Sequence, residues 1–139
     1  MKKLIIFPAL LLSLLAAGQS AWKQGLKYWL QVKLDDRQKA LDGRMDLRYT
    51  NHSPDSLHFI WFHVWPNAYR NDRTSYSDQL LGNGKTGFYF SEKESRGYMN
   101  RLEFRVNGML ADIQDHPEYI DVIKLVLPNG LAPGDSLLI

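Results

Sequence analysis

The sequence predicts an all-β domain, either a saddle-like antiparallel sheet or a sandwich, with a short helical insertion around residues 67–97. Three features predict this fold class. Apolar and polar residues alternate with a period of two in several segments, which is typical of strands. The pair Asn107-Gly108 separates two such segments, as in a tight hairpin. Turn residues punctuate the chain, and no helices alternate with the strands, so a parallel sheet is disfavoured.

The first two predicted strands form a hairpin around the polar turn 35–39. Their apolar faces consist of Tyr28, Leu30, Val32 and Leu34 in one strand and Leu41, Gly43, Met45, Leu47 and Tyr49 in the other. The intervening positions are mostly polar or charged, especially in the second strand. We therefore expect one face of the hairpin to be covered and the other to contact water.

Residues 57–65 predict a strand that is covered on both sides. One face carries Leu57, Phe59, Trp61, His63 and Trp65, and the other carries His58, Ile60, Phe62 and Val64. Because both faces are largely apolar, we expect this strand to lie in the centre of a sheet. Pro66 ends it, since proline cannot donate to a strand ladder.

Residues 67–97 lack the strand pattern, and their length predicts an insertion with some structure of its own. Thr74 or Ser75 is a suitable helix N-cap, and the Gly-Asn-Gly run at 82–84 is a suitable stop. We therefore expect a short helix through Leu81, followed by an aromatic cluster at 88–90.

The Asn107-Gly108 pair predicts a two-residue type I′ turn and with it a register. Its inner pairs are Val106/Met109, Phe104/Ala111 and Leu102/Ile113, and its outer pairs are Arg105/Leu110, Glu103/Asp112 and Arg101/Gln114. The first set is apolar and the second largely polar. A slip by one residue would mix the two sets, so the register is well specified.

Two more strands are predicted towards the C-terminus. Residues 119–127 are apolar on both faces, and the Pro-Asn-Gly run at 128–130 is expected to end them. Residues 132–135, Ala-Pro-Gly-Asp, suit a type II turn. The apolar run 137–139 lies in mid-strand, so we expect residues 19–139 to be an N-terminal β domain that is truncated at its C-terminus.

The N-terminus predicts export. Lys2 and Lys3 precede the apolar run 4–17, and small residues follow, so residues 1–18 are predicted to be a secretory signal cleaved near Gln19. A buried helix or an uncleaved anchor is the alternative, but the run is short for a membrane span. We expect a periplasmic or extracellular protein without a membrane span after cleavage.

Composition excludes several functional classes. The 139 residues are 45% hydrophobic and include no cysteine, which excludes disulfides, thiolate metal sites and a cysteine nucleophile. Of the 17 basic residues, Lys2 and Lys3 lie in the predicted signal, which leaves 15 against 15 acidic residues. A neutral domain has no electrostatic attraction to nucleic acid or anionic membranes.

No catalytic, cofactor-binding or metal-binding residue is assigned in this segment. A zinc site needs three or four converging ligands, but His58 and His63 are five residues apart on one strand and point to opposite faces. His52 and His116 lie in predicted turns, and His63 is interpreted as a core histidine. The motifs HExxH and Gly-x-Ser-x-Gly are absent.

Three other groupings are interpreted as structural. Asp35-Asp36 lies in a polar turn, where carboxylates are usually solvated. The acidic residues between 112 and 118 lack the spacing of a calcium-binding loop. The aromatic stripe Phe59, Trp61 and Trp65 is interpreted as packing, and a sugar-stacking platform is the alternative.

Several segments, in their order and spacing, carry a family resemblance. They are Leu41-Asp42-Gly43, Tyr49-Thr50-Asn51, Ser53-Pro54-Asp55-Ser56-Leu57, the run Ile60-Trp61-Phe62-His63-Val64-Trp65-Pro66-Asn67-Ala68-Tyr69, Val106-Asn107-Gly108 and Leu131-Ala132-Pro133-Gly134-Asp135. Over about residues 26–139 the chain resembles the N-terminal saddle-shaped β domain of gluzincin zinc aminopeptidases, the family of alanyl aminopeptidase and leukotriene-A hydrolase. It is especially similar to exported bacterial members.

The resemblance implies a partner outside this segment. In that family the β domain packs against a thermolysin-like domain of the same chain, whose HExxH motif and downstream Glu hold zinc and whose substrates are peptides. The segment Gly97-Tyr98-Met99-Asn100 is one residue short of the family's Gly-x-Met-x-Asn motif and lies too early. No functional residue is therefore carried over, and whether the parent protein is an active enzyme stays open.

Two functions are expected from these observations. The first is a non-catalytic N-terminal β domain of an exported zinc-dependent aminopeptidase-like metallopeptidase that removes N-terminal residues from peptides. In this case zinc is bound by the catalytic domain and not by this segment. The alternative is an exported, non-enzymatic β module that binds glycan or protein through an aromatic face.

Overall fold

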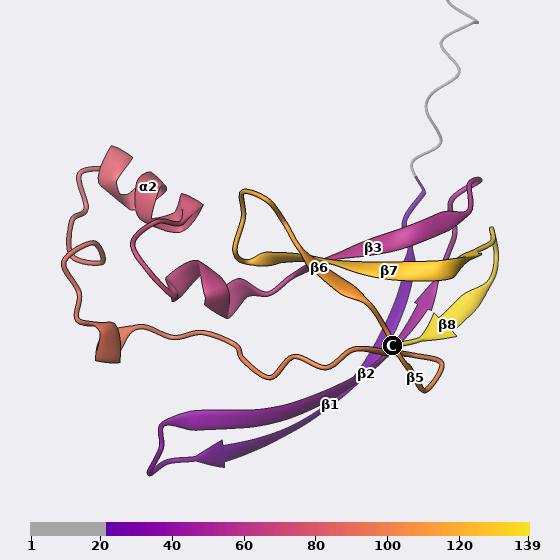
Figure 1. Cartoon of the computed structure of the whole chain (residues 1–139), viewed down its shortest axis with the longest axis horizontal. Coiled ribbons are helices and arrows are strands. Elements are labelled where there is room, and N and C mark those ends of the chain that lie inside the picture. Colours follow the sequence, from indigo (N-terminus) through magenta and orange to yellow (C-terminus); the bar gives the residue numbers. More distant parts are fainter. Residues whose placement is uncertain (1–21) are drawn as a thin grey trace, which may run out of the picture.

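The structure, a computed structural model, describes residues 22–139 and contains two three-stranded antiparallel sheets, one short hairpin and a helical insertion (Figure 1). The sheet orders are β1-β2-β8 and β3-β7-β6, and β4 pairs with β5. The elements are β1 Gly25–Asp35, β2 Ala40–Thr50, β3 Leu57–His63, η2 Trp65–Tyr69, α2 Ser75–Gly82, η3 Lys93–Ser95, β4 Arg105–Val106, β5 Met109–Leu110, β6 Ile113–Asp115, β7 Val122–Leu131 and β8 Ser136–Leu138. The predicted all-β fold with its short helical insertion is confirmed, while the predicted signal at 1–18 lies outside the described residues.

β1 and β2 form a long regular ribbon, as their alternation predicts. All 11 residues of each strand pair, from Asp35 and Ala40 beside the turn to Gly25 and Thr50 at the far end. Asp35 closes the turn, because its Oδ1 accepts hydrogen bonds from two backbone N–H groups at 3.0 and 2.9 Å. In this register the apolar residues of β1 lie opposite an apolar residue or glycine of β2, except Trp29, which lies opposite Asp46 on the other face.

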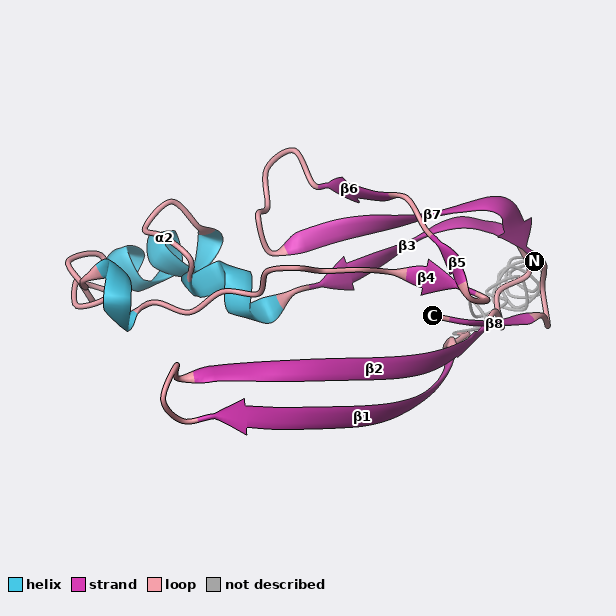
Figure 2. Cartoon of the chain, turned by 60° about the horizontal axis from the view of Figure 1, so that its bottom comes forward, coloured by secondary structure: helices cyan, strands magenta, loops and turns pink. Residues whose placement is uncertain are grey.

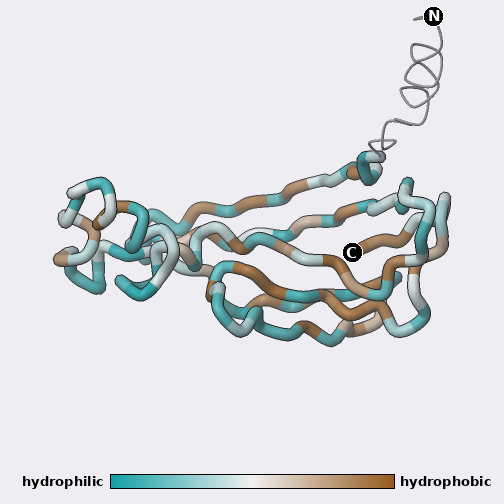
Figure 3. The backbone as a smooth tube through the Cα atoms, turned by 90° about the horizontal axis from the view of Figure 1, so that it is seen from above, coloured by the Kyte–Doolittle hydropathy of each residue, from teal (hydrophilic) through white to brown (hydrophobic). Residues whose placement is uncertain are grey.

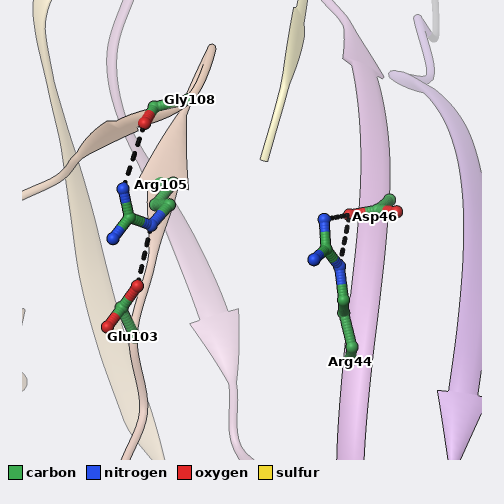
Figure 4. Close-up of polar contacts among 5 residues, drawn as sticks. All are labelled: Arg44, Asp46, Glu103, Arg105 and Gly108. Atoms are coloured by element: carbon green, nitrogen blue, oxygen red, sulfur yellow. Dashed lines mark hydrogen bonds and ion pairs between the residues drawn. The ribbon is translucent and has the colours of Figure 1, made fainter.

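The second face of the ribbon is polar, as predicted. Arg44 donates from Nε and Nη2 to Oδ1 of Asp46, at 3.2 and 3.1 Å (Figure 4). The two side chains are 75% and 46% exposed. An ion pair this exposed adds at most about 1 kcal/mol to stability, so its main effect is to make this face polar and hydrated.

β3 is an edge strand, so the prediction of a central strand covered on both sides is wrong. Within residues 22–139 it pairs only with β7. Ile60 and Val64 are buried on its inner face, whereas Phe59 and Trp61 on the outer face are 42% and 47% exposed. An apolar strand face is buried only where another element packs against it, and the described residues leave the outer face open.

β7 continues through Pro128-Asn129-Gly130, where the sequence predicts a break. The pairing of β3 with β7 shifts between Leu57 and Phe59, which marks an irregular, bulged segment of β7. Gly130 adopts a positive φ of 65° there. A bulge leaves residues outside the ladder, so proline is tolerated and the strand bends instead of ending.

The Asn107-Gly108 turn forms as predicted. Val106 pairs with Met109 across a two-residue loop. Asn107 and Gly108 have φ angles of 50° and 85°, as a type I′ turn requires. Arg105 braces the turn by donating to the Gly108 carbonyl at 3.2 Å and to a neighbouring glutamate at 2.7 Å (Figure 4).

The hairpin is shorter than predicted. The Ala111 N–H donates to the Phe104 carbonyl at 2.9 Å, so the backbones of the predicted pair Phe104/Ala111 are in contact. The predicted pair Leu102/Ile113 is wrong, because Ile113 belongs to β6 and pairs with β7. β6 instead forms its hydrogen-bond ladder with the long strand β7. On the N-terminal side of the hairpin, the positive φ of Arg101, 53°, ends the extended backbone.

The insertion contains the predicted helix α2. Thr74 is its N-cap: the hydroxyl oxygen accepts a hydrogen bond from the Ser77 N–H at 3.2 Å and donates to the Ala68 carbonyl at 2.8 Å. Gly84, with a φ of 72°, follows the helix end. The insertion has a small aromatic core of its own, with ring centroids 4.6 to 6.2 Å apart, made by Tyr69, Tyr76 and Phe88.

The hydrophobic core lies where the two sheets meet, at one end of the ribbon (Figure 2). Its buried members are Ile60, Leu125, Leu127, Leu131 and Leu137. Between β7 and β8 the chain makes the predicted tight turn: the Asp135 N–H donates to the Ala132 carbonyl at 3.1 Å, and Gly134 has a φ of 84°. This turn brings β8 next to β2, so the core joins both sheets.

Tyr49 gives the fold a pH dependence. Its side chain is partly buried against the core, and this burial raises the pKa of Tyr49 above its ordinary value of 10.0. The folded state therefore holds the proton more tightly, so the free energy of unfolding falls as the pH rises above about 10. In urea titrations at pH 8 and pH 11, Tyr49→Phe should reduce this fall. An equal fall in wild type and Tyr49→Phe would contradict this role.

Candidate functional site

The apolar side of the β1–β2 ribbon is open along most of its length. Figure 3 shows hydrophobic and hydrophilic residues alternating along the chain. We call it the ribbon face: it comprises Leu26, Tyr28, Leu30, Val32, Leu34, Leu41 and Met45, which are 40% to 68% exposed. Only the end next to the core is covered, where Leu47 is 6% exposed. The sequence predicted which residues share this face, but its expectation that the face is covered fails for the described chain.

A second open surface lies on the outer side of β3 and β7. We call it the aromatic face: it comprises Phe59, Trp61, Trp65, Tyr119 and Lys124. The Phe59 and Trp61 ring centroids are 5.7 Å apart, with the planes at 73°. The Lys124 ammonium lies 4.5 Å from the Phe59 centroid and 6.0 Å from that of Trp61. Because the rings are edge-to-face and a cation lies on them, they do not form a flat platform.

His116 belongs to the framework of the aromatic face. Its ring stacks on Tyr119, with centroids 4.7 Å apart, and lies 5.3 Å from the ring of Trp61. Its Nδ1 accepts hydrogen bonds from the N–H groups of Glu118 and Tyr119, at 3.1 and 3.2 Å. The hydrogen bonds to this nitrogen therefore stabilise the turn before β7.

His63 and His52 are also held by protein groups. His63 Nε2 lies 2.9 Å from Asp121 Oδ2, and its side chain is 35% exposed, so it is a surface histidine and not the core residue expected. His52 Nδ1 lies 2.9 Å from the Lys23 carbonyl oxygen. No group of three or more His, Cys, Asp or Glu within residues 22–139 is placed to hold a metal ion.

The acidic groupings do not assemble into a site. A shallow hollow of about 280 Å³ beside η2 is lined by Asn67, Arg70, Asp115, His116, Pro117, Glu118 and Ile120. The hollow thus combines two carboxylates, Asp115 and Glu118, with one guanidinium, Arg70, and two carboxylates alone are too few for a metal site. Asp112 instead accepts a hydrogen bond from Gln114 at 3.1 Å. The Gly97–Asn100 segment contacts η2, where the Met99 N–H donates to Asn67 Oδ1 at 2.8 Å.

Sequence reasoning missed the most connected polar residue, Asn51, which is fully buried. Its Nδ2 donates to the carbonyls of Asp55 and Leu131 at 2.8 and 2.9 Å, and its Oδ1 accepts from the N–H and hydroxyl of Ser53 at 2.9 and 2.6 Å. Its own backbone N–H donates to the Asp135 carbonyl at 2.9 Å. Asn51 thus ties together the β2–β3 turn, the end of β7 and the turn before β8.

No family model, curated protein or solved structure matches the chain. The resemblance to gluzincin aminopeptidases is therefore carried by the sequence segments named above and by nothing else. Within residues 22–139, no helix has the length and apolar character needed to cross a bilayer. The two open apolar faces are the features from which a function is best inferred.

Proposed function

We propose that the chain is the non-catalytic β domain of an exported zinc aminopeptidase of the gluzincin type, and that its ribbon face docks onto the catalytic domain. One observation carries the proposal: seven large apolar side chains lie on one face of a regular two-stranded ribbon and remain 40% to 68% exposed. Soluble proteins rarely leave such a row of apolar residues in water unless it is an interaction site.

The energetics favour docking through this face alone. Burying one large aliphatic or aromatic side chain is worth about 1.5–3 kcal/mol, so covering the row outweighs the cost of fixing two domains that share one chain. The reverse face of the ribbon carries exposed charges, such as the pair Arg44–Asp46, which burial would desolvate. A neighbouring domain would therefore pack against the apolar face of the ribbon and leave the charged face in water.

In this proposal the described chain contributes no reacting group. Zinc and the general base would be held by the catalytic domain, and zinc would activate the attacking water there. The β domain would contribute a rigid wall that packs against that domain, kept in shape by the core at the junction of the two sheets.

The natural polypeptide provides the test. An antibody raised against residues 22–139 would be used to isolate it from the source cells, and its mass, its zinc content and its hydrolysis of alanyl-p-nitroanilide would be measured. We expect a chain much longer than 139 residues, one zinc per chain and hydrolysis that a chelator abolishes. A zinc-free protein of 16.1 kDa or less without this activity would overturn the proposal.

The aromatic face favours a second candidate, an exported β module that binds protein or glycan. Trp61 and Phe59 are nearly half exposed in the described chain, which the packing interpretation does not require. Their 73° interplanar angle suits an irregular protein surface better than the flat ring of a sugar. If this candidate holds, Trp61→Ala should abolish capture of a ligand from the exported fraction, whereas Trp22→Ala should not.

A further inference from the structure

The outer edge of β1 is a long unpaired strand edge. β1 lies at the margin of its sheet, and no strand among residues 22–139 pairs with that side. Nine consecutive residues of the strand, 26–34, are exposed. Such an edge presents a row of free N–H and C=O groups, which is a template for pairing with another strand.

The side chains of β1 are suited to pairing with themselves. Two copies related by a two-fold axis pair antiparallel, and each residue then lies opposite a residue on the same face. With the axis at Gln31, the opposed pairs are Lys27 with Asp35, Tyr28 with Leu34, Trp29 with Lys33 and Leu30 with Val32. Every pair is thus opposite in charge, apolar on both sides, or a cation beside an aromatic ring.

Neighbouring registers lack this complementarity. An axis at Leu30 places Lys27 opposite Lys33 twice, and like charges directly opposite each other are destabilising. An axis at Val32 moves Lys27 past the end of the partner strand, opposite Arg37. An axis between two residues would set apolar side chains against polar ones throughout.

We propose that two copies of this chain pair edge to edge through β1, with the two-fold axis at Gln31. The product is a six-stranded sheet of order β8-β2-β1-β1-β2-β8, with both ribbon faces on the same side. The proposal is independent of the function proposed above, because it uses the edge of the ribbon and leaves its apolar face available.

Single cysteines test the register, since the full 139-residue chain has none of its own. Opposed residues in an antiparallel pair have Cβ atoms about 4.5–5.5 Å apart, close to the span of a disulfide. After mild oxidation, Gln31→Cys should give a disulfide-linked dimer, and Leu30→Cys and Val32→Cys should give at least roughly fivefold less. Equal cross-linking at all three positions, or a maximum at Leu30→Cys or Val32→Cys, would overturn the proposal.

A charge reversal tests the pairs flanking the axis. Within its own ribbon Lys27 lies opposite Arg48, so Lys27→Asp replaces a repulsive pair by an attractive one and keeps the chain folded. Between two copies it sets Asp against Asp35 at two equivalent places. Sedimentation equilibrium should show the dimer dissociation constant rising roughly tenfold or more. An unchanged constant, or a wild-type chain that is monomeric at all concentrations, would overturn the proposal.

Discussion

Replacing Leu125 by alanine is expected to lower the free energy of unfolding by about 2–5 kcal/mol. Leu125 is 0% exposed in the middle of β7 and belongs to the cluster that joins the two sheets. Truncation removes apolar contacts and leaves a cavity that neighbours on both sheets cannot fill by small shifts. The midpoint of urea unfolding, followed by tryptophan fluorescence, measures the loss.

The matched control is a leucine outside the core. Leu110 is 70% exposed at the short hairpin, so Leu110→Ala should change the free energy of unfolding by no more than about 0.5 kcal/mol. If the two variants unfold at the same urea concentration, the core does not lie at the junction of the sheets, and the described packing is incorrect.

Asn51→Ala is expected to cost about 3 kcal/mol, although it removes only a small polar side chain. The change leaves the Asp55 and Leu131 carbonyls and the Ser53 hydroxyl without their shortest partners, in a region that excludes water. Three segments lose a common anchor, so unfolding should become easier and hydrogen exchange in the turn before β8 should accelerate. Both effects are measurable in one hydrogen-exchange experiment with a urea series.

The control for Asn51 is Asn71, which makes a similar local contact at the surface. Its Oδ1 accepts a hydrogen bond from the Arg73 N–H at 2.9 Å in an exposed turn. Asn71→Ala should therefore cost no more than about 0.5 kcal/mol. A loss below about 1 kcal/mol for Asn51→Ala would show that its hydrogen bonds are replaced by water.

Features set by local interactions were predictable from the sequence. Asn107-Gly108 fixed the tight turn because few residue pairs tolerate its positive φ angles. Thr74 or Ser75 marked the start of α2, because a hydroxyl can accept from the first free N–H groups of a helix, and Thr74 does so. The alternation in β1 and β2 gave their faces, since side chains of a strand alternate whatever it pairs with.

Features set by long-range packing were not predictable. Ile113 lies on β6 instead of the hairpin because β7, several residues away, competes for it. The sequence predicted that Phe59 and Trp61 are covered, but both are exposed. The sequence shows that a strand face is apolar and not whether another element covers it. Asn51 precedes a Ser-Pro turn and looks like an ordinary turn residue; only the fold brings the Leu131 and Asp135 carbonyls to it.

The docking role of the ribbon face is tested most directly by the reactivity of a cysteine placed on it. Leu41, 68% exposed, lies on this face, and Asp42, its neighbour in β2, points to the opposite side. In the chain of residues 22–139, Leu41→Cys and Asp42→Cys should react with a maleimide at similar rates. In the natural polypeptide, Leu41→Cys should react at least about tenfold more slowly, because only transient opening exposes it, while Asp42→Cys keeps its rate. Equal rates for Leu41→Cys in the two proteins would contradict docking through this face.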